Sequence, residues 1–257
     1  MTRHPERSEG SQPTRSFAVC AAQDDGLSFA ERGIAFPIPV LDADELQAVR
    51  AAYARLVDAH GGTLKHLDRA HYSFGWAYDL TLHPRVLAAV SEILGDDVVV
   101  WGSLILSKPP HDDGFIAWHQ DGEYADFLGE APAVSAWIAL TDSTAESGCM
   151  RVVPGSHTTK LAHAEKHDPR NMLSRGQEIA AEVDEAQAVD VVLRAGEMSL
   201  HDVNIVHGSN PNRASWWRTG FIVRYSTPRM LRAASPVVVA RGRRAEHLDT
   251  MRGRPTG

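Results

Sequence analysis

Hydrophobic residues recur with two different periods along the chain, and the change lies near residue 96. Between residues 39 and 62 they return every three or four positions, which is typical of an amphipathic helix. These positions are Leu46, Val49, Tyr53, Leu56 and Val57. Asp42 stands at the expected N-cap and a Gly-Gly pair ends the pattern. A second helix is predicted over residues 83–95, with Pro84 in its first turn and Gly95 after its end.

From Asp96 onward the chain consists of short β-rich runs separated by Gly, Pro, Asn and Asp turns. The runs are DVVVWGSLILSK, GFIAWHQD, AVSAWIALTD, CMRVVPGS, AVDVVLRAGEMSLHD, VNIVHG and WWRTGFIVRYST. Many short strands with turn signals are typical of a sandwich or a barrel. We therefore expect a mainly β protein with flanking helices (α+β), built on a jelly roll, or double-stranded β-helix, core.

The polar and apolar pattern also predicts the limits of the domain. Residues 1–25 are polar and lack periodicity, so we expect a flexible N-terminal tail. Residues 26–257 are then a single jelly-roll domain with an N-terminal helical layer and a C-terminal arm from Arg229. The polar segment 158–188 is expected to be an insertion between strands.

Composition restricts the partners and the location of the protein. The chain has 257 residues, is 43% hydrophobic and carries a formal net charge of −7. This acidity argues against general affinity for nucleic acid or anionic membrane. With two cysteines and no long apolar run, we expect a cytoplasmic protein, either a monomer or a homodimer, without a disulfide framework.

Four H-x-D strings are candidates for half of a metal site. They begin at His66, His111, His119 and His247. Only His119 closes an apolar run that is predicted to be a strand, and residues i and i+2 of a strand share a face, about 7 Å apart. His119 and Asp121 are therefore the candidate pair, and the other three strings are expected to be exposed and polar.

A second cluster follows in SLHDVNIVHGSNPNRASWWRTGFIVRY, where turn formers separate two predicted strands. His207 ends the first strand and Arg218 begins the second, and alternation places Arg218 and Arg224 on one face. Two histidines and a carboxylate form a facial triad for Fe(II), and an inward arginine grips a carboxylate. The pattern predicts a cosubstrate with a carboxylate at one end and a chelating group at the other.

His201 is a rival ligand or a neighbour of the site, because it shares strand parity with His207. Six residues of extended strand span about 20 Å, so we do not expect both histidines to bind one ion. His60, His83 and His163 are expected to be surface or packing residues.

The strings WHQD, GCMRVVPGSH and HGSNPN…WWR, in this order, resemble the phytanoyl-CoA dioxygenase (PhyH) family of Fe(II)/2-oxoglutarate oxygenases, from about Leu64 to Arg229. The resemblance implies that His119, Asp121 and His207 bind iron. It also implies residues that bind the cosubstrate 2-oxoglutarate. These are Arg218 and Ser209 at its C5 carboxylate, Gln120 and Trp137 in its pocket, and Lys65 as the match to an early family lysine. His157 and Arg151 of the second string are expected to stabilise a turn at the barrel mouth.

The resemblance implies a dioxygenase that uses O2 to hydroxylate an unactivated C–H bond and releases succinate and CO2. Related halogenases lack the carboxylate ligand, so Asp121 favours hydroxylation. Desaturation, epimerisation and oxidative cyclisation use the same ligands and stay open. A small molecule, such as a natural-product intermediate of secondary metabolism or a modified amino acid, is expected in preference to an acyl-CoA.

Candidate substrate-wall residues are Tyr72, Trp76, Tyr124, Phe127 and Trp137, with Arg224 and the C-terminal arginines as possible anion contacts. Two alternatives from other classes remain. The first is a cupin-like metalloenzyme without redox chemistry, which has no use for Arg218. The second is a non-catalytic jelly-roll binding protein.

Overall fold

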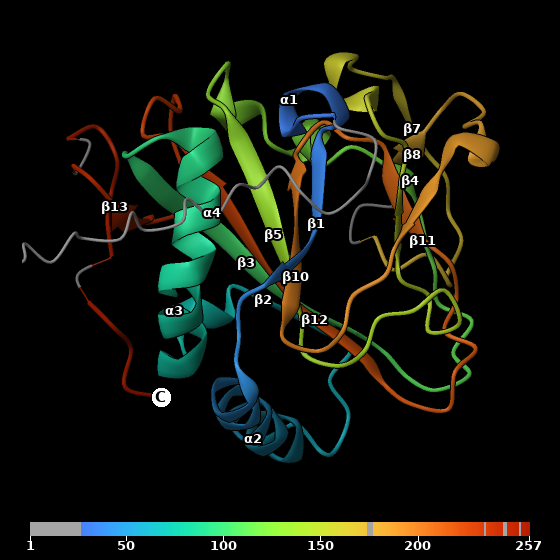
Figure 1. Ribbon diagram of the computed structural model, residues 1–257, viewed down its shortest axis with the longest axis horizontal. Helices are drawn as coiled ribbons and strands as arrows, with labels where there is room; N and C mark the ends of the chain where they lie inside the picture. Colours follow the sequence, from blue (N-terminus) through green and yellow to red (C-terminus); the bar gives the residue numbers. More distant parts are fainter. Residues whose placement is uncertain (1–26, 174–176, 234, 244–245, 252) are drawn as a thin grey trace, which may run out of the picture.

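The computed structural model describes residues 27–173, 177–233, 235–243, 246–251 and 253–257. The expected tail 1–25 lies outside the described residues. Two antiparallel sheets face each other, and helices cover the outer face of the larger one (Figure 1). This arrangement is the jelly roll with a helical layer that the sequence predicts.

The larger sheet has seven strands in the order β1-β10-β5-β12-β3-β13, with β2 also paired to β3. Their bounds are β1 Ile34–Pro39, β2 His66–Asp68, β3 Val98–Lys108, β5 Ala133–Ala139, β10 Glu197–Asp202, β12 Arg218–Ser226 and β13 Val238–Arg241. The second sheet has the order β4-β11-β6-β9. Its strands are β4 Ile116–His119, β6 Met150–Val152, β9 Val189–Val191 and β11 His207–Ser209.

The helices follow from local signals in the sequence. Helix α2 (Ala43–Ala59) begins after Asp42, whose side chain accepts a hydrogen bond from the Glu45 backbone N–H and completes a capping box. Helix α4 (Pro84–Leu94) has its proline in the first turn and ends before Gly95. Both predicted helices are therefore confirmed. The shorter helices are α1 (Phe29–Arg32) and α3 (Gly75–Thr81).

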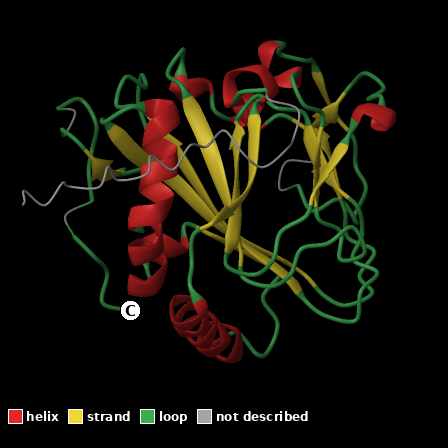
Figure 2. Ribbon diagram, in the orientation of Figure 1, coloured by secondary structure: helices red, strands yellow, loops and turns green. Residues whose placement is uncertain are grey.

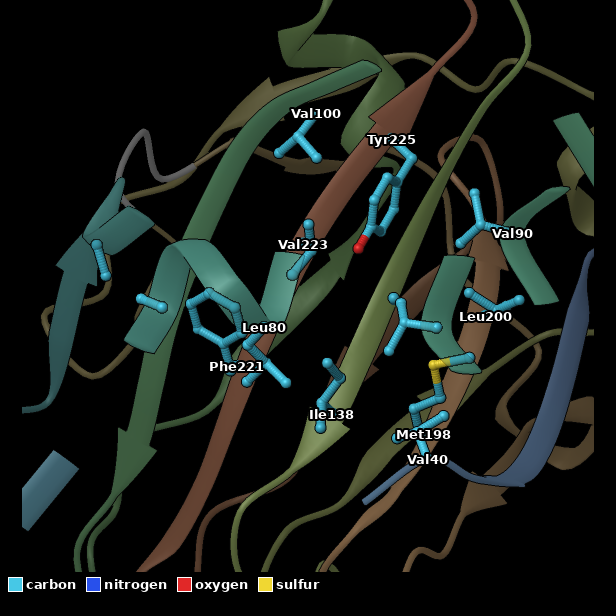
Figure 3. Close-up of a cluster of buried hydrophobic side chains, with 14 of the residues drawn as sticks. Val40, Leu80, Val90, Val100, Ile138, Met198, Leu200, Phe221, Val223 and Tyr225 are labelled. Carbon is cyan, nitrogen blue, oxygen red and sulfur yellow. The ribbon is translucent and has the colours of Figure 1, made fainter. Parts of the chain in front are cut away.

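A hydrophobic core lies between the helices and the larger sheet (Figure 3). Val90 of α4 and Leu80 of α3 pack there against Phe221, Val223 and Tyr225 on the outer face of β12. A second apolar cluster lies between the two sheets. Residues of β12 thus alternate between the helix layer and the space between the sheets, and this alternation directs Arg218 and Arg224 inward.

The two segments outside the regular barrel have ordered contacts of their own. The insertion 158–188 holds the ribbon of β7 (His163–Glu165) and β8 (Gln177–Ile179) and a 3-10 turn, η5 (Glu185–Gln187). The C-terminal arm adds β13 to the edge of the larger sheet beside β3. Figure 2 shows how much of the chain around the second sheet is loop. No helix within the described ranges is long and apolar enough to cross a membrane.

Candidate metal centre

Three buried side chains converge where the second sheet meets the inside of the barrel. His119 is the last residue of β4 and His207 is the first of β11, and the two are register partners. Asp121 begins the 3-10 helix η2 (Asp121–Tyr124) directly after β4. One ligand atom from each of these residues lies within 4.8 Å of the others. The structure therefore brings together the three side chains that the sequence singled out.

The sequence pattern predicts Asp121 on the same strand as His119, and the structure contradicts this placement. The strand ends at His119, and Asp121 lies on the 3-10 helix. The turn still brings the two groups together, with His119 Nε2 3.7 Å from Asp121 Oδ1. Proximity here comes from the turn and not from strand alternation.

The backbone fixes which nitrogen of each histidine is free. His119 Nδ1 lies 2.9 Å from the Ala117 carbonyl oxygen, and His207 Nδ1 lies 2.9 Å from the Ile205 carbonyl oxygen. A carbonyl oxygen can only accept, so each Nδ1 carries the proton and donates. Nε2 is left with its lone pair, and both rings are held in the orientation that a metal ligand needs.

The charge states also suit a metal. Burial by itself would raise the pKa of Asp121, but Arg224 and the two histidines hold that pKa well below 3.8. Burial, together with His119, keeps the pKa of His207 well below 6.5. An ionised carboxylate and a neutral imidazole are the forms that bind a divalent cation.

His201 lies much closer to the triad than the sequence predicted. The rings of His201 and His207 are 5.1 Å apart, where a continuous strand would give about 20 Å. The predicted distance of about 20 Å is wrong because β10 ends at Asp202. A turn at 203–206 then carries the chain into the other sheet before His207. His201 Nδ1 is buried without a hydrogen-bond partner, and the residue lines the same cavity.

The triad opens into a cavity of about 120 Å³. Its other walls are mainly apolar. They include Leu104, Leu106, Ile116, Tyr124, Trp137, Met150, Met172, Leu173 and Ile222. The charged groups among the described lining residues are the carboxylate of Asp121 and the guanidinium groups of Arg218 and Arg224.

Arg218 is 1% exposed and is only partly satisfied by the protein. Its Nε donates to Ser143 Oγ at 3.3 Å, and its Nη1 is buried without a partner. The guanidinium carbon lies 4.4 Å from the centre of the Trp137 ring, a cation–π contact. Gly220 makes this possible, because a Cβ there would lie 2.1 Å from the indole. Arg218 also lines the cavity, and a buried guanidinium with an unpartnered N–H there is suited to an anion.

Lys108, which the sequence analysis does not predict as a site residue, lies beside Arg218. Lys108 is the register partner of Arg218 across β3 and β12, and its Nζ donates to Ser209 Oγ at 2.7 Å. Burial, with Arg218 nearby, lowers the pKa of Lys108 to about 6. Lys65, expected to match an early family lysine, pairs instead with Asp112 and is half exposed. The missed signal was strand parity, which places Lys108 on the same face as two residues of the cavity wall, Leu104 and Leu106.

A family model, Phytanoyl-CoA dioxygenase (PhyH), matches residues 29–220. The chain belongs to the phytanoyl-CoA dioxygenase family. This confirms the family that the sequence motifs indicated.

The chain is similar to several oxygenases in sequence and in structure. An ectoine dioxygenase of Halomonas elongata is 28% identical over 220 residues, which cover 76% of this chain and 66% of that protein, just under two thirds of its length. The solved structure of a non-heme monooxygenase, ThoJ in its apo form, is 34% identical with a TM-score of 0.74, and covers 89% of this chain and 87% of that one. The α-ketoglutarate-dependent carbocyclase SnoK from nogalamycin biosynthesis is 26% identical with a TM-score of 0.60, over 78% and 81% of the two chains. The fold that the chain shares with these solved structures confirms the predicted jelly roll.

Gln120, expected from the family resemblance to line the cosubstrate pocket, points away from the cavity. Its Nε2 donates to the carbonyl oxygens of Thr159 and Asn204, and its Oε1 accepts from the Leu161 backbone N–H at 2.8 Å. Gln120 therefore connects the end of β4 to the insertion 158–188 and to the turn that precedes His207. Gln120 itself has an extended backbone, with φ −122° and ψ 122°, so its side chain points to the side opposite those of His119 and Asp121.

The remaining expected wall residues separate into two groups. Tyr124 and Trp137 line the cavity. Tyr72, Trp76 and Phe127 pack elsewhere: Tyr72 donates to a backbone carbonyl, and the other two contact aromatic rings of β12 and β3. Among the C-terminal arginines, Arg232, Arg241 and Arg254 form ion pairs with acidic residues that do not line the cavity.

The three other H-x-D strings lie outside the triad. His66, His111 and His247 are exposed, as expected, although His66 reaches the rim of the cavity. His163 is a packing residue whose Nε2 accepts from the Gln120 backbone N–H at 3.1 Å. Arg151 of the second motif is paired with acidic residues of the neighbouring η5 and β9.

Proposed function

We propose that the protein is an Fe(II)- and 2-oxoglutarate-dependent dioxygenase that hydroxylates an unactivated C–H bond of a small molecule. The observation that carries this proposal is the meeting of a metal-binding triad and an unsatisfied arginine in one cavity. The related ectoine dioxygenase and ThoJ monooxygenase support the same reaction class. A metalloenzyme without redox chemistry would leave Arg218 without a role.

The residues fit the groups that this chemistry requires. His119 Nε2, His207 Nε2 and a carboxylate oxygen of Asp121 would hold the metal, because backbone carbonyl oxygens already accept the Nδ1–H of both histidines. Arg218 Nη1 has no partner in the protein and would donate to the C5 carboxylate of 2-oxoglutarate, and Ser209 Oγ accepts a hydrogen bond from Lys108, the register partner of Arg218. When bound, iron, 2-oxoglutarate and O2 supply the oxidising chemistry, with succinate and CO2 as products.

The protein contributes position and water exclusion. Its carbonyl groups orient the imidazoles, and its apolar walls keep the reacting centre dry. The same ligand set serves desaturation, epimerisation and cyclisation, and the carbocyclase SnoK supports cyclisation as the second candidate. Product mass separates hydroxylation, which adds one oxygen, from cyclisation and desaturation, which both remove two hydrogens. We further propose that the enzyme works as a monomer or homodimer in the cytoplasm, in keeping with its two cysteines.

Anaerobic titration with Fe(II) and then 2-oxoglutarate tests the proposal. We expect a weak visible metal-to-ligand charge-transfer band, which Asp121→Ala or His207→Ala removes. His111→Ala is the matched control, because His111 is an exposed residue of another H-x-D string, and it should keep the band. If wild-type protein binds Fe(II) but gives no band with 2-oxoglutarate, the oxygenase proposal is wrong and the non-redox metalloenzyme replaces it.

A further inference from the structure

A second arginine lines the cavity, and the proposed function gives it no role. Arg224 lies on the same strand as Arg218, six residues later, and its side chain lines the cavity beside the triad. Its Nη2 is 3.5 Å from Asp121 Oδ1, and its Nε is buried without a hydrogen-bond partner. The guanidinium carbon lies 5.5 Å from the centre of the Trp101 ring, which supports the group from one side.

Asp121 cannot serve as the full partner of Arg224 in a metal-loaded site. Oδ1, the oxygen nearest Arg224, also faces His119 Nε2 at 3.7 Å, whereas Oδ2 accepts from Ser135 Oγ at 3.3 Å. The oxygen that Arg224 approaches is therefore on the side that the triad offers to a metal. A metal bound there would draw on the same negative charge and leave the guanidinium short of a counter-ion.

The charges of the described lining residues, the metal and 2-oxoglutarate also leave Arg224 without a counter-ion. A divalent metal and the two arginines carry four positive charges, whereas 2-oxoglutarate and Asp121 carry three negative charges. One positive charge remains, on Arg224. An unbalanced charge at the wall of a mainly apolar cavity is costly when only 22% of its side chain is exposed to water, so the remaining ligand should supply one negative charge.

On this basis, and resting on the proposed function, we infer that Arg224 binds an anionic group of the substrate. The substrate is then a small molecule with a carboxylate or a similar singly charged group on a compact, mainly apolar body. A compact body agrees with the size of the cavity, because about 120 Å³ corresponds to roughly four water molecules at the liquid volume of about 30 Å³ each. Leu104, Ile116 and Ile222 supply the apolar contacts for the body.

The test uses probes small enough to enter the cavity. Acetate, butanoate and hexanoate are each compared with the corresponding amide for their effect on the charge-transfer band of the anaerobic Fe(II)/2-oxoglutarate complex, and binding is measured by calorimetry. We expect each acid to bind about 10- to 100-fold more tightly than its amide, and affinity to rise with chain length. Equal binding of acids and amides, or no binding of any acid, would overturn the inference.

Variants separate substrate binding from support of the metal ligand. Arg224→Gln should abolish the preference for acids while keeping the affinities for Fe(II) and 2-oxoglutarate within about threefold, and Arg224→Lys should retain part of the preference. Arg213→Gln is the control, because Arg213 is an exposed arginine paired with Asp113. If Arg224→Gln weakens Fe(II) binding tenfold or more, Arg224 positions Asp121 and the inference is wrong. Absence of the band in wild-type protein would instead count against the proposed function, and calorimetry with the Fe(II)-loaded protein would still compare acids with amides.

Discussion

Replacing Arg218 by methionine should separate the binding of 2-oxoglutarate from the stability of the fold. The substitution keeps an unbranched stem and removes the guanidinium, which is 1% exposed and has an unpartnered Nη1. A group placed for packing alone would have its N–H donors satisfied within the protein. A group placed for a ligand keeps a donor free, at a cost to the ligand-free fold.

The two effects have opposite signs, and the structure gives their size. Burial lowers the pKa of Arg218 from 12.5 to about 10, which corresponds to roughly 3 kcal/mol of unfavourable burial of the charge. The Trp137 contact and the single bond to Ser143 return about 2 kcal/mol. Without ligand, Arg218→Met should therefore be as stable as wild type or about 1 kcal/mol more stable. Two charge-assisted hydrogen bonds to a carboxylate contribute about 3–6 kcal/mol, so the Kd for 2-oxoglutarate should rise by about 10²–10⁴.

Urea unfolding of the ligand-free protein and anaerobic titration of the charge-transfer band measure the two quantities. Arg218→Lys is the matched variant, because it keeps the charge but lacks the planar fork, and its Kd should lie between those of wild type and Arg218→Met. A loss of more than 2 kcal/mol of unfolding free energy, with a Kd for 2-oxoglutarate changed less than tenfold, would refute the reasoning. Arg218 would then be a structural residue.

Three further substitutions test the surroundings of the site. Gly220→Ala places a methyl group against the Trp137 indole, so we expect a loss of about 1–3 kcal/mol in urea unfolding together with weaker 2-oxoglutarate binding; unchanged stability would contradict this. Lys108 has a folded pKa of about 6 against 10.5 unfolded, so the unfolded chain binds more protons between these values and wild-type stability should rise with pH there. Lys108→Met should make the unfolding free energy less dependent on pH between 6.5 and 9, and it should be more stable than wild type at pH 7. Equal pH slopes for the two proteins would contradict the lowered pKa of Lys108. His163→Ala removes the acceptor of the Gln120 backbone N–H between two metal ligands, and we expect about tenfold weaker Fe(II) binding by calorimetry; equal affinity would show that the contact is only packing.

The elements that the sequence predicted best are those specified by neighbouring residues. The capping box at Asp42 and the proline at the start of α4 act over one turn, and the structure has both helices where these signals place them. The three metal-ligand candidates could also be named from the sequence, because the family motifs contain them, although Asp121 lies on a 3-10 helix and not on the predicted strand.

The features that the sequence argument missed depend on pairing and on where strands stop. Strand parity places Lys108 inward, but only the register of β3 with β12 puts it opposite Arg218. The turn at 203–206 holds Val203, Ile205 and Val206, so its composition resembles a continuing strand. Gly122 lies against this turn, and a Cβ there would lie 2.1 Å from Asn204 Oδ1. That contact joins residues 82 positions apart, which local patterns do not reveal.

The division of the site between two sheets explains why the turn matters. His119 and His207 belong to the second sheet, whereas Arg218, Arg224 and His201 belong to the larger one. The distance between the histidines of the triad and the two arginines is therefore set by the packing of the sheets, through the apolar cluster between them. The turn at 203–206 is the covalent connection that fixes one sheet against the other at this point. A continuous strand would keep His201 and His207 on one sheet, about 20 Å apart, and would build no cavity between them.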